Sequence, residues 1–403
     1  MPDPTSRTPL DRAELRVLRR ARRVLSRNRG ATDRLIAQRA AYATGPRQDG
    51  FFLEAMNENF AHHFLGCPLY RARCLQVGVT PGDIRRVEDL SRIPYIFVTV
   101  FKRNDLLTGS PEKVRLTLTS SGTGGERSAI HLDARSLRRI RRIVHNIYRD
   151  LKMTSRELTN YLCFTYDPAV AKDLGTAFSD ELLTRLTRVG QVHYAIRPDG
   201  QGGWHLDREA CFEALERFER EGSAFRMLGF PAHAWEVLLD YVRVRNRTLR
   251  FPLRSYVLTG GGWKTLGDRE IPKPVFRSEV ARILGIPQEH IRDLYGMVEH
   301  GVPYTECEAG RMHVPIHSRV LVRDPGTLEL LPPGQTGIFH MLTPYLSSFP
   351  ALSLLTTDVG HLESGCPCGR SAPVIVLEGR GGVTRHKGCA LAALDILSPE
   401  GVE

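Results

Sequence analysis

A ten-residue segment of small and hydroxyl-bearing side chains, Thr119–Ser128, lies between two short stretches in which apolar and polar residues alternate. The alternation in Val114–Leu118 and in Ile130–Leu132 predicts two β-strands joined by this segment. Small residues allow successive backbone N–H groups to converge into a nest that binds phosphate. The spacing matches neither the Walker loop nor the dinucleotide fingerprint. The segment therefore indicates either a phosphate-binding loop or a flexible hairpin turn. Its candidate phosphate-binding residues are Ser120, Ser121, Gly122, Thr123, Gly124 and Gly125.

Beyond this hairpin, apolar stretches of strand length alternate with segments of helical spacing. Asp133 and Asp207 each precede such a segment and are expected to cap a helix, and Pro231 suits the first turn of another. This alternation predicts an α/β fold with a largely parallel sheet. Strands dominate towards the end of the chain. The expected strands are Tyr161–Thr165, Arg226–Phe230, Tyr256–Thr259, Ile291–Leu294, His313–Val322, Gly337–Leu342 and Ser353–Thr357.

The composition is that of an ordinary soluble globular protein, because 41% of the 403 residues are hydrophobic and 25% are charged. The longest apolar run, Tyr95–Phe101, is far too short to span a bilayer, so no membrane span is expected. The N-terminus lacks the apolar core of a secretory signal. Eight cysteines without a regular framework suit a reducing compartment, and we expect a cytoplasmic protein.

The net charge of +11 is unevenly distributed, because residues 1–40 hold eleven arginines and only four acidic side chains. A basic helix is expected over Asp11–Arg27. Such a helix could dock on nucleic acid, anionic lipid or an acidic partner. Alternatively, it could be a solvated N-terminal extension or a helix packed on its own domain, and we favour one of these two. No zinc-finger, helix-turn-helix or aromatic stacking pattern supports nucleic-acid binding.

Two further features suit small-molecule binding. Gly260–Lys264 follows an expected strand, and bare backbone at the carboxyl end of a sheet strand allows a flat ring to lie against it. Asp358 carries a carboxylate, which can accept two hydrogen bonds from a vicinal diol. Each feature can equally be an ordinary turn.

Three thiols and an imidazole occur in two short segments of the chain. Cys307 and His313 are six residues apart, and Cys366 and Cys368 are two apart. This set predicts a closed tetrahedral zinc site, although Cys-x-Cys is tighter than the usual Cys-x-x-Cys. The alternative is a group of free thiols in loops.

The segment Ser120–Gly125 resembles the phosphate loop of the adenylate-forming enzymes, which include the acyl- and aryl-CoA ligases. From about Ile93 onwards the chain is most similar to the acyl-protein synthetases of bacterial bioluminescence, which are subunits of a fatty acid reductase. The resemblance implies an α/β fold in which mixed sheets are flanked by helices. It also implies three parts: a basic helical extension (1–50), a catalytic domain (51–378) and a much shortened C-terminal segment (379–403).

The resemblance also implies roles for particular residues. Glu299 would hold Mg²⁺, and the loop Ser120–Gly125 would cradle the phosphates of ATP. The four cysteine and histidine residues would hold a structural zinc ion, as in the aryl-CoA ligase branch. The remaining nucleotide contacts would come from Gly260, Gly261, Gly262, Tyr295, Gly296, Asp358 and Arg380.

A cysteine near the C-terminus is the acyl acceptor in the bioluminescence branch, and Cys389 occupies the corresponding place. The neighbouring residues Arg385, His386 and Lys387 would favour its thiolate. The alternative is that Cys389 begins a buried apolar helix. Lys387 is also the lysine available where a full ligase carries a catalytic lysine in a further small domain.

The expected activity is ATP-dependent conversion of a carboxylic acid, such as a fatty acid, to acyl-AMP, followed by transfer to Cys389. An acyl reductase or a carrier protein would then take the acyl group. Two alternatives stay open: a CoA ligase, and a degenerate zinc-stapled scaffold. The scaffold alternative draws on departures from the family pattern at Gly124, Ser128, Val298 and Gly381-Gly382.

Overall fold

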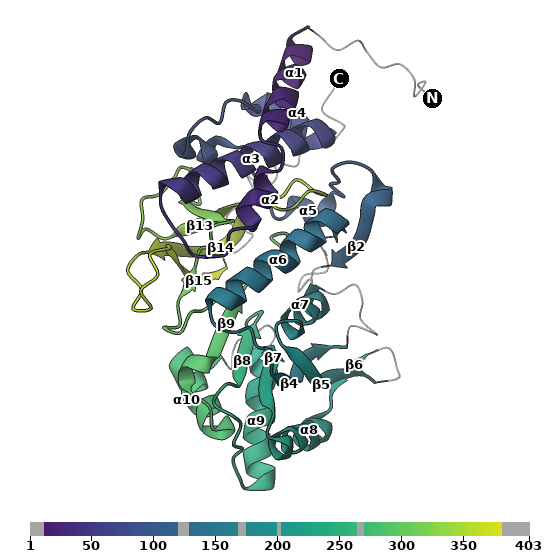
Figure 1. Cartoon of the computed structure of the whole chain (residues 1–403), viewed down its shortest axis with the longest axis vertical. Coiled ribbons are helices and arrows are strands. Elements are labelled where there is room, and N and C mark those ends of the chain that lie inside the picture. Colours follow the sequence, from purple (N-terminus) through teal and green to yellow (C-terminus); the bar gives the residue numbers. More distant parts are fainter. Residues whose placement is uncertain (1–11, 120–128, 168–174, 200–202, 264–269, 381–403) are drawn as a thin grey trace.

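The computed structural model describes residues 12–119, 129–167, 175–199, 203–263 and 270–380 (Figure 1). The chain begins with helices gathered at one end of the molecule, and a short strand and helix lead from them to the first hairpin. These elements are α1 (Arg12–Arg27), α2 (Ala31–Ile36), α3 (Pro46–Gly66), α4 (Pro68–Val77), β1 (Ile96–Phe97) and α5 (Val100–Arg103). Two 3-10 turns, Val87–Arg92 and Pro111–Lys113, lie on either side of α5.

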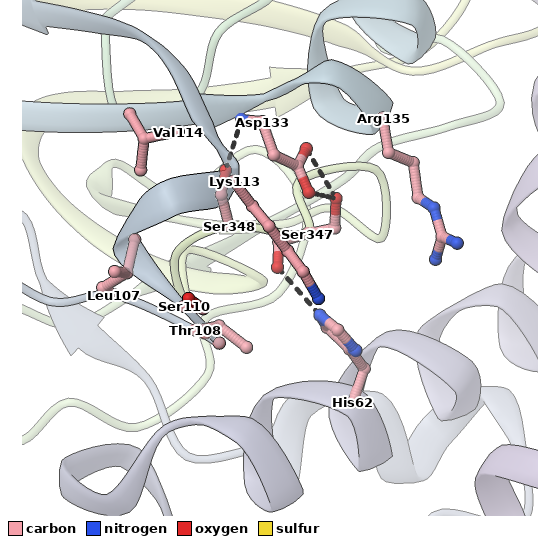
Figure 2. A pocket seen from close by; sticks show the side chains of 11 residues that line it. His62, Leu107, Thr108, Ser110, Lys113, Val114, Asp133, Arg135, Ser347 and Ser348 are labelled. Atoms are coloured by element: carbon pink, nitrogen blue, oxygen red, sulfur yellow. Dashed lines mark hydrogen bonds between the residues drawn. The ribbon is translucent and has the colours of Figure 1, made fainter.

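The predicted hairpin is confirmed in its described part. Strands β2 (Val114–Thr119) and β3 (Ala129–Asp133) are antiparallel, and helix α6 (Ala134–Asp150) follows at once. Asp133 caps α6 as predicted, because its carboxylate accepts a hydrogen bond from the Ser136 N–H at 2.6 Å. The Ser347 hydroxyl lies 2.9 and 3.0 Å from the two oxygens of the same carboxylate (Figure 2). The helix is therefore fixed both to the hairpin and to a loop far along the chain.

A seven-stranded sheet forms the lower half of the molecule in Figure 1, with the order β10-β9-β8-β7-β4-β5-β6. Its central strands β5, β4, β7, β8 and β9 are parallel, as the alternation of strands and helices predicts. Its elements are β4 (Leu158–Tyr166), α7 (Gly175–Thr184), β5 (Arg188–Pro198), β6 (Trp204–Leu206), α8 (Arg208–Glu221), β7 (Ala224–Gly229), α9 (Pro231–Arg245), β8 (Tyr256–Gly260), α10 (Lys273–Leu284), β9 (Ile291–Tyr295) and β10 (Tyr304–Thr305).

Both faces of this sheet are covered, so its strands are apolar on both sides. Along β4, Leu162 and Phe164 belong to a core shared with α8, α9 and α10. Tyr161 and Cys163 belong to the larger core, to which α6 contributes. Successive side chains of a strand point to opposite faces, so each core takes every second residue. Asp207 caps α8 as predicted, accepting the Ala210 N–H at 3.1 Å.

A second sheet of six strands belongs to the later part of the chain. Its members are β11 (Met312–His313), β12 (Arg319–Arg323), β13 (Gly337–Leu342), β14 (Ser353–Glu363) and β15 (Val374–Arg380), and β1 pairs with β14. The single strand predicted over His313–Val322 is wrong. Pro315 has no N–H to donate to a ladder, and the chain turns there, with the Ser318 N–H bonded to the Pro315 carbonyl at 3.0 Å.

The N-terminal helices pack on the rest of the molecule. Ala21 of α1 and Leu35 of α2 are fully buried in the larger core. Asp49 of α3 pairs with Arg319 at 2.7 Å, and the Ile316 N–H bonds to the Ala41 carbonyl at 2.8 Å. Of the two interpretations that we favour for the basic helix, the structure shows packing on its own domain and not a solvated extension. In the part of the chain described here, no helix combines the length and the apolar character needed to cross a membrane.

Candidate functional site

Tyr295 and Asp358 join the two sheets through a buried hydrogen bond. Tyr295 is the last residue of β9, and Asp358 lies in the middle of β14. The tyrosine hydroxyl donates to Asp358 Oδ2 at 2.7 Å, and both side chains are less than a tenth exposed. Arg380 ends β15, and its Cα is the register partner of Asp358. Three candidate nucleotide-binding residues are therefore brought to one place by two different sheets.

The glycine turn after β8 lies beside the same strand end. Gly260 is the register partner of Leu294 on β9, and a Cβ on Gly260 would meet the Leu294 Cβ at 3.0 Å. Gly261 and Gly262 both have positive φ, of 79° and 66°. The turn and Tyr295 thus share the carboxyl edge of the parallel sheet, where open α/β sheets bind ligands.

Glu299 lies in a tight turn that follows β9. The N–H groups of His300 and Gly301 both bond to the Met297 carbonyl, at 3.1 and 3.0 Å. Glu299 itself is 4% exposed. The turn is also held by Tyr345, whose hydroxyl donates to the His300 carbonyl at 2.5 Å. A carboxylate held in this way is a hard oxygen ligand of the kind that Mg²⁺ prefers.

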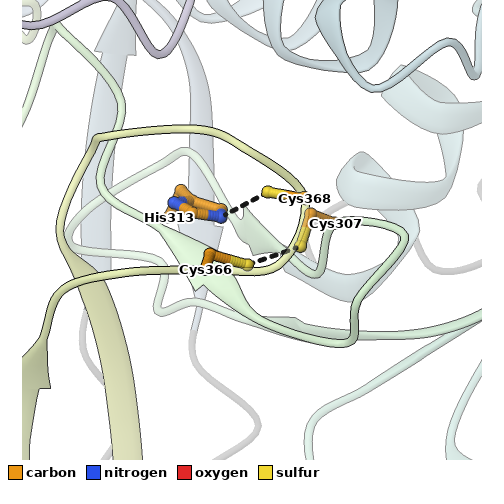
Figure 3. A group of neighbouring side chains, drawn as sticks. All are labelled: Cys307, His313, Cys366 and Cys368. Carbon is orange, nitrogen blue, oxygen red and sulfur yellow. Dashed lines mark hydrogen bonds between the residues drawn. The ribbon is translucent and has the colours of Figure 1, made fainter.

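The four predicted metal ligands lie together. The donor atoms of Cys307, His313, Cys366 and Cys368 are all within 4.8 Å of one another (Figure 3). The Sγ atoms of Cys307 and Cys366 are 3.7 Å apart, and Cys368 Sγ is 3.2 Å from His313 Nε2. In a tetrahedral zinc site with Zn–S bonds of about 2.3 Å, two sulfur ligands are separated by about 3.8 Å. The donor set and its spacing therefore fit zinc.

The groups around these donors orient them towards a common point. His313 Nδ1 lies 2.8 Å from the Ala372 carbonyl, so Nδ1 carries the proton and Nε2 offers its lone pair to the cysteines. The Gly310 N–H bonds to the Cys307 carbonyl at 2.9 Å, and the Gly369 N–H bonds to the Cys366 carbonyl at 3.0 Å. Each cysteine segment is thus a closed turn, which fixes its sulfur.

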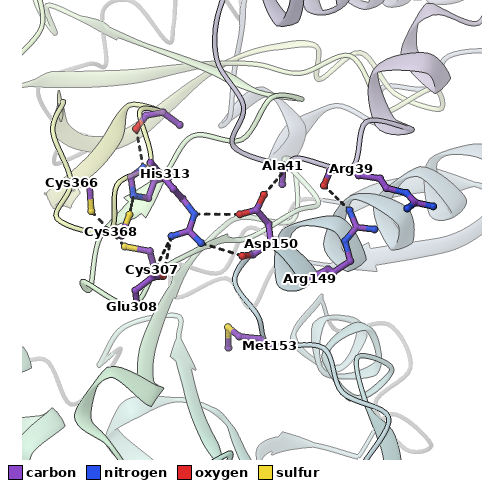
Figure 4. Close-up of polar contacts among 12 residues, drawn as sticks. Arg39, Ala41, Arg149, Asp150, Met153, Cys307, Glu308, His313, Cys366 and Cys368 are labelled. Atoms are coloured by element: carbon purple, nitrogen blue, oxygen red, sulfur yellow. Dashed lines mark hydrogen bonds and ion pairs between the residues drawn. The ribbon is translucent and has the colours of Figure 1, made fainter.

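Arg370, two residues after Cys368, ties the two segments that carry the cysteines to the end of α6. Its partners Glu308 and Asp150 are seen beside the cysteines and His313 in Figure 4. Its Nη1 is 2.9 Å from Glu308 Oε2, and its Nη2 donates to the Asp150 carbonyl at 3.1 Å. The Asp150 carboxylate also accepts the Ala41 N–H at 3.0 Å. One guanidinium therefore links both cysteine turns, the last residue of α6 and the segment before α3.

The segment that carries Cys307 is also tied to β9, the strand that ends at Tyr295. Glu306, directly before Cys307, is buried and accepts the Asp293 N–H of β9 at 2.7 Å. Arg277 of α10 pairs with the same carboxylate, and Lys273 lies 2.6 Å from Asp293. Glu306 therefore connects the segment that carries Cys307 to β9, the strand that ends at Tyr295.

Several predicted site residues lie outside the described residues. They are the phosphate-loop residues Ser120–Gly125, Lys387 and Cys389. Thr119 and Ala129, which flank the loop in the sequence, are register partners in the β2–β3 hairpin.

The sequence analysis did not identify Asp150, Arg370 or Asp180 as important residues. The bonds of Asp150 to Arg370 and to Ala41 each join positions more than 100 residues apart, so no local pattern reports them. Asp180 of α7 is buried and accepts a hydrogen bond from Thr165 of β4. Burial raises its pKa to about 7.

Comparisons with known proteins agree with this geometry. The acyl-protein synthetase family LuxE matches residues 30–397. The "long-chain-fatty-acid--luciferin-component ligase" of Vibrio harveyi is 27% identical over 341 residues, which cover 83% of this chain and 84% of that protein. The protein of the same name from Aliivibrio fischeri is 23% identical over 346 residues, covering 85% and 87%.

Among solved structures, an open form of 2-hydroxyisobutyryl-CoA ligase in complex with 2-HIB-AMP and CoA superposes with a TM-score of 0.66. It has 15% identity and covers 85% of this chain and 77% of that chain. The fold of the adenylate-forming enzymes, predicted from the phosphate-loop resemblance, is thereby confirmed. The chain belongs to the acyl-protein synthetase family LuxE.

Proposed function

We propose that the protein activates a carboxylic acid with ATP and transfers the acyl group to its own Cys389. A fatty acid is the substrate class indicated by the names of the curated relatives. The observation that carries the proposal is the hydrogen-bonded pair Tyr295 and Asp358, which places a tyrosine ring and a carboxylate at the carboxyl edge of the parallel sheet in a chain of this family. Asp358 would accept the ribose hydroxyls, and the tyrosine hydroxyl would orient its carboxylate.

The reaction would proceed in two steps. First, a carboxylate oxygen of the substrate attacks the α-phosphorus of ATP, and the bond to pyrophosphate breaks. Glu299 would hold the Mg²⁺ that neutralises the developing charge, and Ser120–Gly125 would cradle the leaving phosphates. Second, the Cys389 thiolate attacks the acyl carbon and AMP leaves. A thioester of this kind divides one difficult transfer into two easier ones.

The bare backbone of Gly260–Gly262 would accommodate the adenine ring beside Tyr295, and Arg380 would reach the ribose or a phosphate. Zinc is the metal proposed for Cys307, His313, Cys366 and Cys368, in a structural role. The acyl group would leave Cys389 for a protein acceptor, either an acyl reductase or a carrier protein.

The test is the mass of the intact protein after incubation with ATP, Mg²⁺ and a series of carboxylic acids. We expect an acyl-sized increment that hydroxylamine removes. It should be absent in Cys389→Ala and retained in Cys211→Ala, which removes a buried thiol of α8. AMP release that requires CoA, without an adduct, would instead identify a CoA ligase. No ATP turnover with any acid would contradict both activities.

A further inference from the structure

A cavity of about 420 Å³ lies at the open end of the β2–β3 hairpin (Figure 2). It is bounded by α3, by the start of α6, by the segment before β2 and by the loop at 347–348. The polar side chains used below are His62, Thr108, Ser110, Lys113, Asp133 and Arg135. None of the lining residues belongs to the candidate nucleotide site or to the cysteine cluster.

Two cations, Lys113 and Arg135, line this cavity. In the described chain, neither side chain forms an ion pair, whereas Arg34, Arg139 and Arg141 in nearby helices each pair with a carboxylate. The carboxylate on the wall, Asp133, already accepts the Ser136 N–H and the Ser347 hydroxyl. The lining therefore carries one excess positive charge, at side chains that can turn towards a ligand.

The rest of the wall is held in place by its own hydrogen bonds. His62 Nε2 donates to the Ser347 carbonyl at 2.8 Å, and the Thr108 hydroxyl pairs with His63 Nδ1 at 2.8 Å. The Ser348 hydroxyl donates to the His131 carbonyl at 2.6 Å. Because these groups are satisfied, the shape of the cavity is set before any ligand arrives, and the charge that remains to be neutralised comes from Lys113 and Arg135.

We propose that this cavity binds a phosphate group through Lys113 and Arg135, with the Ser110 hydroxyl as a third donor. Lys113 and Arg135 approach from different elements, and a tetrahedral phosphate presents oxygens in several directions, whereas a carboxylate presents two in one plane. The cavity is several times larger than phosphate alone, so it can hold a phosphate ester as well as free phosphate. The amino end of α6 is capped by Asp133 and is not needed for this binding.

A phosphate bound in the cavity would stabilise the β2–β3 hairpin. Val114 and Asp133 are register partners at the open end, and Thr119 and Ala129 are partners at the closed end, next to the proposed phosphate loop. Five residues at about 3.3 Å each separate the two ends by about 16 Å. A phosphate held between Lys113 and Arg135 would bridge the residue before β2 to the first turn of α6, and so fasten the two strands together.

The test is a ³¹P NMR titration of the full chain with inorganic phosphate and with glycerol 3-phosphate. We expect the phosphate signal to broaden saturably as it binds. In the double variant Lys113→Ala/Arg135→Ala, the affinity for phosphate should fall by at least about tenfold. The matched control is Lys102→Ala/Arg142→Ala, which removes the same charges from exposed positions on α5 and α6. Tighter binding of glycerol 3-phosphate would identify an ester as the ligand, and equal binding would identify free phosphate.

Hydrogen exchange supplies a second measurement. Phosphate should slow exchange of the β2 and β3 amides in the wild type and in the control, but not in the double variant. Equal phosphate binding by the double variant and the control would overturn the proposal. So would displacement of the bound phosphate by ATP, because the phosphate would then belong to the nucleotide site. Failure of the proposed acyl transfer would leave these expectations unchanged.

Discussion

Tyr295 and Asp358 are 63 positions apart and belong to different sheets, yet the tyrosine hydroxyl donates to the aspartate carboxylate at 2.7 Å. Tyr295 also packs nearly parallel to Tyr304, with ring centroids 6.0 Å apart, so its ring is held from one side. The hydrogen bond is therefore both a connection between sheets and a means of orienting the carboxylate that we assign to ribose.

The variant Tyr295→Phe should weaken ATP binding and lower the free energy of unfolding by about 1.5–3 kcal/mol, the usual contribution of a hydrogen bond to a charged group. Titration with ATP and urea unfolding would measure the two effects. The control is Tyr304→Phe, which loses a buried hydrogen bond to the Ser318 hydroxyl at 2.6 Å. That variant should lose stability but keep its ATP affinity. Equal effects on ATP would contradict the assignment of Asp358.

Metal analysis of the purified protein should find about one zinc ion per chain, and Cys366→Ala should abolish it. Cys74→Ala removes another buried cysteine, in α4, and should retain the zinc. A chelator should lower the thermal midpoint of the wild type and leave that of Cys366→Ala unchanged, because metal binding energy is folding energy. Full zinc content in Cys366→Ala would exclude this residue as a ligand.

Arg370→Ala should destabilise the protein more than Arg311→Ala does. The side chain of Arg370 lies between Asp150 and Glu308 and is 15% exposed, whereas that of Arg311, which pairs with Glu363, is 40% exposed. Loss of Arg370 should cost more than the about 1 kcal/mol of an exposed pair but less than the about 3–5 kcal/mol of a fully buried one, because Glu308 is itself 45% exposed. Zinc affinity should fall with it, since both cysteine turns lose a common anchor. Urea unfolding and competition with a zinc chelator would measure the two quantities.

Asp180 should make stability depend on pH. Burial raises its pKa to about 7, so the folded protein keeps a proton that the unfolded chain releases near pH 4. The free energy of unfolding should therefore fall as the pH rises from about 4 to about 7, by as much as about 4 kcal/mol from this group. Asp180→Asn should flatten that slope, whereas Glu181→Gln, on the exposed side of the same helix, should preserve it. A slope that persists in Asp180→Asn would assign the proton to another group.

The elements that could be predicted from sequence are those that local physics determines. The hairpin, the caps at Asp133 and Asp207 and the start of α9 at Pro231 each depend on neighbours within a few residues. The split between β11 and β12 also had a local signal, since Pro315 is the third residue of the predicted strand His313–Val322.

The sequence predicted which residues form the site, but not how they are arranged in space. The spacing of the cysteines and the histidine in the sequence predicted the four metal ligands. The approach of Cys307 to Cys366, however, depends on the pairing of β11 with β15. The contact of Arg370 with Asp150 joins positions 220 residues apart, and nothing near either residue in the sequence points to the other. Long-range ion pairs of this kind follow from the whole fold and are not visible in local patterns.

The N-terminal helices and the loops between them complete their packing against segments that are synthesised much later. Asp49 pairs with Arg319, Ala41 bonds to Ile316, and Thr44 meets Ser371 across 327 positions. During synthesis, α1–α3 would leave the ribosome long before these partners. Their apolar side chains would stay exposed to solvent until the partners are made. Such late closure makes folding slow and exposes the nascent chain to aggregation and to chaperones. Low temperature or added chaperones during expression should therefore raise the yield of folded protein more than a change of buffer after lysis.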